Sequence, residues 1–111
     1  MCYTNYGARV DAYAWGENVV TLSYLRANET PLFSAGPDRL YVPNFGGTSS
    51  AGAIVAGAVA SLQGHVQAVL GYPFPPGIVR LAMTGSGTAQ SGDFSRPIGT
   101  MPNLAALDFQ K

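Results

Sequence analysis

Apolar residues recur at intervals of three and four after Ser49, and this spacing predicts a helix that reaches at least Leu62. The helix either ends near Gly64 or runs on to Leu70. Its opposite side carries small residues in place of charged ones, so we expect the helix to be buried on all sides. The apolar face is formed by Ala51, Ile54, Val55, Ala58, Val59 and Leu62, and the small side by Ala53, Ala56, Gly57 and Ala60.

Before this helix the pattern changes to that of strands. Residues 8–14 alternate between apolar and polar side chains, which predicts one strand, and residues 19–25 are rich in β-branched and aromatic side chains, which predicts a second. A turn is expected at 15–18 and a loop at 26–40. Residues 40–42 are again typical of a strand, so the loop can include a short ribbon.

After the helix, the prolines and glycines of residues 71–76 predict a break. Pro75 and Pro76 suit the first turn of a second helix, whose apolar side lies within residues 77–84 and which ends at 85–87. Residues 88–99 are expected to form a loop, and residues 102–107 a short last helix.

Composition limits the chain to at most one small domain, because it has 111 residues. Its hydrophobic content of 47% is enough for a core, and only 11% of its residues are charged, against about a quarter in average globular chains. The formal net charge is zero, which predicts neither a nucleic acid nor an anionic membrane as partner. The single cysteine, Cys2, cannot form an internal disulfide.

Neither an export signal nor a membrane span is predicted. The first residues lack a basic stretch followed by an apolar one. The apolar run from Ala51 to Leu62 is too short for a bilayer, which needs about 20 apolar residues. We therefore expect no membrane partner.

Ser49 stands where a glycine-containing loop meets the predicted helix, and this position suits a nucleophile. Its backbone N–H is one of the first helical donors without an intrahelical acceptor, and the helix dipole places partial positive charge beside it. Such an N–H can hold an oxyanion after the hydroxyl attacks a carbonyl. The alternative is structural, because Thr48 and Ser49 are also favoured helix-capping residues.

Residues 47–60 resemble the nucleophile block of the subtilases, the subtilisin-like serine peptidases. Their sequence is Gly-Thr-Ser-Ser-Ala-Gly-Ala-Ile-Val-Ala-Gly-Ala-Val-Ala. It departs from the usual pattern at residues 52–54. An upstream segment of the family is similar to two parts of this chain, Asn-Tyr-Gly at residues 5–7 and Val-Asp-Ala-Tyr-Ala-Trp-Gly at residues 10–16. In the second part, Trp15 replaces the usual proline. Ile-Gly at 98–99 and Pro-Asn-Leu at 102–104 resemble the end of bacterial subtilase domains.

The resemblance implies that residues 1–111 are the C-terminal part of one subtilase catalytic domain. The implied fold class is α/β, a parallel sheet around a central buried helix that starts at the nucleophile Ser49. The complete parent is expected to be secreted or attached to the cell envelope, to cleave polypeptides, and to bind structural calcium in some members. No cofactor is expected for the chain itself, and the missing N-terminal part of the same domain is its expected partner.

The rest of the catalytic machinery is absent from the chain. A serine needs a general base, and the subtilisin order is Asp, His, Ser, but no histidine precedes Ser49. The only histidine, His65, would lie about 24 Å further along a straight helix, so a surface role is expected for it. Asn44 does not match the family's oxyanion asparagine. The G-x-S-x-G elbow of α/β-hydrolases is excluded by Ala51.

Three further positions have weaker interpretations. Asp11 is expected to be a solvated acid, because one carboxylate does not make a calcium site. Phe45 can line the leaving-group side of a cleft or simply pack under the loop. Ser50 takes the place of the methionine found in several subtilisins, which would remove a sulfur open to oxidants.

The sequence therefore predicts a fragment of a serine-type endopeptidase, with Ser49 as nucleophile and as oxyanion donor through its N–H. Because the Asp and His blocks are missing, we expect the chain alone to be inactive and to expose apolar surface. The alternative is a non-catalytic remnant that acts as an interaction or structural module with a partner chain.

Overall fold

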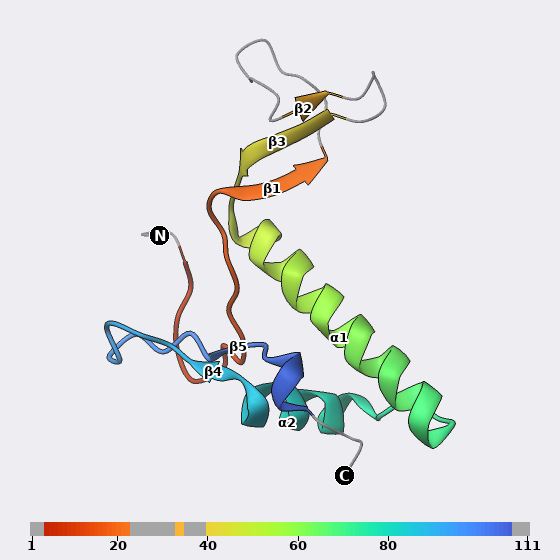
Figure 1. Cartoon of the computed structure of the whole chain (residues 1–111). Coiled ribbons are helices and arrows are strands. Elements are labelled where there is room, and N and C mark those ends of the chain that lie inside the picture. Colours follow the sequence, from red (N-terminus) through yellow and green to blue (C-terminus); the bar gives the residue numbers. More distant parts are fainter. Residues whose placement is uncertain (1–3, 23–32, 35–39, 108–111) are drawn as a thin grey trace. The chain divides into compact units, whose positions relative to one another are not determined.

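The computed structural model describes residues 4–22, 33–34 and 40–107 (Figure 1). The chain divides into two compact units, which are described separately. One unit is Trp15–Ala51, and the other combines Met1–Ala14 with Gly52–Lys111.

The first unit holds a three-stranded antiparallel sheet in the order β1-β3-β2. Its strands are β1 (Val19–Leu22), β2 (Phe33–Ser34) and β3 (Leu40–Phe45). Val19 pairs with Phe45 and Thr21 with Val42, so an irregularity in register falls between these two pairs. The predicted strand at 19–25 is confirmed for its first four residues, and its remaining residues lie outside the described part of the chain. The predicted ribbon is also confirmed, with β3 longer than expected.

The predicted long helix is confirmed as α1 (Thr48–Leu70), a helix of 23 residues. Of the two predicted ends, the one at Leu70 is correct, and Gly64 lies inside the helix. Gly71 has a φ of 81°, and its N–H donates to the Gln67 carbonyl at 3.0 Å, which is a common way for a helix to end.

The helix is not buried on all sides in this chain, and the exposed apolar surface expected for the chain alone is found on it. The predicted apolar face is half-buried or buried, whereas the side formed by small residues is exposed. Only 11% of the most apolar 18-residue window of α1 is buried. The periodicity of the side chains was therefore predicted correctly, but the element expected to cover the small side is not found among the described residues.

The apolar run was predicted to be too short to cross a membrane, but the helix that contains it is longer than that run. The helix extends beyond Leu62, and its best window has a mean hydropathy of 1.5, so by length and composition alone α1 could span a bilayer. Core helices of soluble proteins share these properties. The absence of a membrane partner remains a prediction.

The core of the second unit lies between α1 and α2 (Pro76–Ser86), which begins with a proline as predicted. Four side chains are buried there, with exposed fractions of 1–8%: Leu62, Val66, Val79 and Met83. The connection between the helices is fixed by Gln63, whose Nε2 donates to the Phe74 carbonyl and whose Oε1 accepts from the Phe74 N–H, both at 2.9 Å.

The N-terminal and C-terminal segments of this unit meet through backbone hydrogen bonds, one from the Gly7 N–H to the Pro97 carbonyl and two between Asp11–Tyr13 and Thr100. The predicted strand over residues 8–14 is wrong, because residues 8–9 form a turn and only Ala12 makes an isolated parallel bridge, to Thr100. The predicted loop 88–99 is interrupted at its start, since β4 (Thr88–Ala89) pairs antiparallel with β5 (Thr100–Met101). The predicted last helix is a single 3-10 turn, η1 (Leu104–Ala106).

All described strand pairs are antiparallel, so the strands described here do not form the parallel sheet that the resemblance implies. The subtilisin-like α/β fold remains a prediction. The structure itself shows helices combined with two small antiparallel sheets.

Candidate functional site

The loop that precedes Ser49 is held by a backbone contact between Gly47 and Gly16. The Gly47 N–H donates to the carbonyl of the buried Gly16 at 2.7 Å. A Cβ atom at Gly46 would lie 2.9 Å from the same carbonyl oxygen, which is closer than real Cβ contacts allow. Gly47 has a φ of 108°, a backbone conformation that favours glycine. The two glycines before Thr48 therefore let the loop lie against Gly16 before the chain enters α1.

Ser49 lies in the first turn of α1 and is exposed. The first backbone hydrogen bond of the helix runs from the Ser50 N–H to the Gly47 carbonyl, at 3.1 Å. The Ser49 N–H has no acceptor among the described residues, as expected for a donor in the first helical turn. The first turn contains no acidic residue, so no carboxylate on the helix competes for this donor.

The capping alternative finds no support in these contacts. Within the described part of the chain, neither the Thr48 hydroxyl nor the Ser49 hydroxyl makes a hydrogen bond. The Ser49 hydroxyl and N–H are thus both open at the start of a 23-residue helix. This arrangement can offer a nucleophilic oxygen and an oxyanion donor from the same residue.

Ser50, the next residue, has the opposite environment. It is 3% exposed, and its hydroxyl has no hydrogen-bond partner in the described structure. A buried hydroxyl without a partner costs free energy, commonly about 1–3 kcal/mol. In the sequence only the family pattern distinguishes Ser50, and the contrast between an exposed Ser49 and a buried Ser50 was not predicted.

The other sequence candidates do not complete a catalytic site around Ser49. His65 is exposed on α1 and lies beside a cavity of about 250 Å³ that Ser61, Leu62, Leu104 and Leu107 also line. It is some 24 Å from Ser49 along a straight helix, far beyond hydrogen-bond reach of about 3 Å. Asn44 is exposed on β3, and Phe45 is 44% exposed, so Phe45 does not simply pack under the loop.

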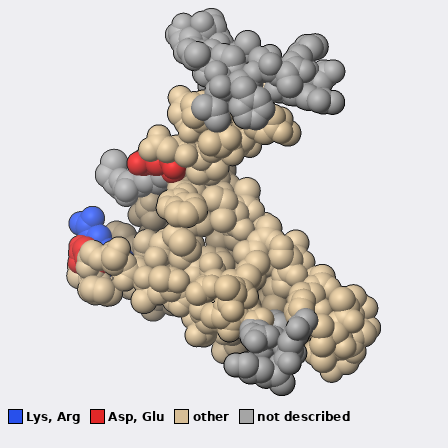
Figure 2. Space-filling model, viewed as in Figure 1, with Lys and Arg blue, Asp and Glu red and all other residues tan. Residues whose placement is uncertain are grey.

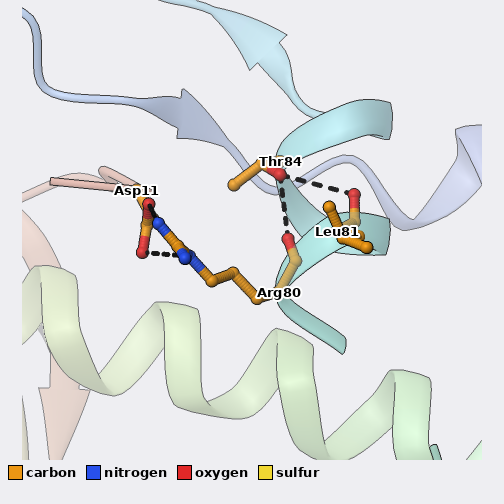
Figure 3. Close-up of polar contacts among 4 residues, drawn as sticks. All are labelled: Asp11, Arg80, Leu81 and Thr84. Atoms are coloured by element: carbon orange, nitrogen blue, oxygen red, sulfur yellow. Dashed lines mark hydrogen bonds and ion pairs between the residues drawn. The ribbon is translucent and has the colours of Figure 1, made fainter. Parts of the chain in front are cut away.

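Asp11 is partly exposed, as expected for a solvated acid, and in addition it pairs with Arg80 of α2 (Figure 3). The Arg80 Nη2 donates to Oδ1 at 2.7 Å and its Nε to Oδ2 at 2.8 Å. These hydrogen bonds, with the charge of Arg80, hold the pKa of Asp11 below its ordinary value. Residues 69 positions apart leave no local sequence signal, so the pair could not have been found by pattern.

The described residues do not indicate a binding site for a metal ion or for a polyanion. They contain no group of three or more His, Cys, Asp or Glu side chains that could hold a metal ion. On the face drawn in Figure 2, charged side chains cover only a small part of the described surface. Cys2 lies outside the described residues.

Comparison with known proteins does not assign the chain to a family. No family model matches it, and no curated protein or solved structure matches it either.

Proposed function

We propose that this chain is the C-terminal part of a subtilisin-like serine endopeptidase domain in which Ser49 is the nucleophile. The observation that carries the proposal is the open Ser49 at the start of α1, within a Gly-Thr-Ser block that resembles the subtilase nucleophile block. Two features add support. Both the hydroxyl and the N–H of Ser49 lack partners among the described residues, and the loop before them requires glycine.

In the proposed reaction, the Ser49 Oγ attacks the carbonyl carbon of a peptide bond while a histidine takes its proton. The carbonyl oxygen becomes an oxyanion, which accepts a hydrogen bond from the Ser49 N–H. The C–N bond then breaks, and the histidine returns the proton to the leaving amine. Water attacks the resulting acyl-Ser49 ester in the same manner, which releases the carboxylic acid and restores the serine hydroxyl.

The histidine, its orienting aspartate and a second oxyanion donor must come from polypeptide that this chain does not contain. The exposed small-residue side of α1 is consistent with that requirement, because α1 combines an apolar composition with 11% burial of its best window. We propose that the rest of the domain covers this side of α1. The chain alone then has a nucleophile without a base and does not hydrolyse peptides.

A second candidate is a non-catalytic module that binds a partner chain through α1. The exposed side of α1 favours it as strongly as it favours the peptidase fragment. The two candidates differ at Ser49, because a binding module has no need for an open serine hydroxyl.

The coding sequence upstream of the Met1 codon gives the first test. If it encodes Asp and His blocks, the extended protein should hydrolyse a casein substrate, and Ser49→Ala should abolish the activity. An extended protein that contains both blocks, folds, and still lacks Ser49-dependent hydrolysis would exclude the peptidase and favour the binding module.

A further inference from the structure

We draw no further inference here: the strongest candidate, the surface at the loop before Ser49 where the aromatic side chains of Trp15 and Phe45 are exposed, carries no proposal, because nothing in the structure shows what covers it.

Discussion

Arg80 binds Asp11 through two hydrogen bonds and so joins the N-terminal segment to α2 across 69 residues of sequence. The pair is partly exposed, with side-chain exposed fractions of 53% for Arg80 and 39% for Asp11. Water and salt therefore weaken it, and its contribution to stability is expected to be small and dependent on ionic strength. Its structural effect is to hold the segment around Asp11 against α2.

The first prediction concerns pH. Because Arg80 lowers the pKa of Asp11 in the folded chain below the ordinary value of 3.8, the pair stabilises the fold at pH values above 3.8. This contribution is lost as the pH falls through the lowered pKa. Asp11→Asn should therefore melt at a lower temperature than the wild type at neutral pH, and the difference should vanish in acid. A difference that persists at the acid end would contradict this assignment.

The second prediction concerns Gly99, which has a φ of 81° and lies against Asp11 and Ala12. A Cβ atom there would collide with the Asp11 carbonyl, so Gly99→Ala should break the pairing with Thr100. Gly92→Ala is the control, since Gly92 has a φ of 95° but open space around it. That variant should lose only about 1–2 kcal/mol, the cost of the left-handed backbone conformation. Chemical denaturation should show a clearly larger loss for Gly99→Ala, and equal losses would disprove the close approach.

The third prediction compares two valines of α1. Val66 is 1% exposed and Val69 is 47% exposed. Val66→Ala removes two buried carbon atoms and leaves a cavity, which should cost about 1.5 kcal/mol or more of unfolding free energy. Val69→Ala should change stability by less than about 0.5 kcal/mol. Similar losses in urea titrations would mean that α1 does not pack on α2 through Val66.

The fourth prediction concerns membranes. Insertion of α1 would expose the Gln63–Phe74 hydrogen bonds to lipid and separate Leu62 and Val66 from α2. We therefore expect the chain to stay in the aqueous fraction when it is floated with vesicles of phosphatidylcholine and phosphatidylglycerol. Flotation with the vesicles would contradict this expectation.

Local patterns were enough to predict the helices but not their surroundings. The spacing of apolar residues and the prolines at 75–76 predicted the starts of α1 and α2 closely, because helix periodicity and proline geometry act over a few residues, but left the end of α1 open between Gly64 and Leu70. The alternation at residues 8–14 misled the prediction, since a strand also needs a neighbour, and the described residues supply one only at Thr100.

The burial of side chains and the pairs between distant residues could not be predicted from local sequence patterns. The small side of α1 suggested close packing on all sides, yet the covering element is not among the described residues, so composition alone gave the wrong burial. The Asp11–Arg80 pair and the buried Ser50 depend on tertiary contacts. For the candidate site, the position of Ser49 at the helix start followed from sequence, whereas its lack of hydrogen-bond partners required the structure.

The most direct measurement of the central claim is the reaction of Ser49 with a fluorophosphonate, read by peptide mass spectrometry. The isolated chain lacks a base, so it should give no adduct above a Ser49→Ala control. The protein extended upstream through its Asp and His blocks should carry the adduct on Ser49 and should retain it in Ser50→Ala. An extended, folded protein with both blocks but no adduct on Ser49 would contradict the assignment of Ser49 as the nucleophile.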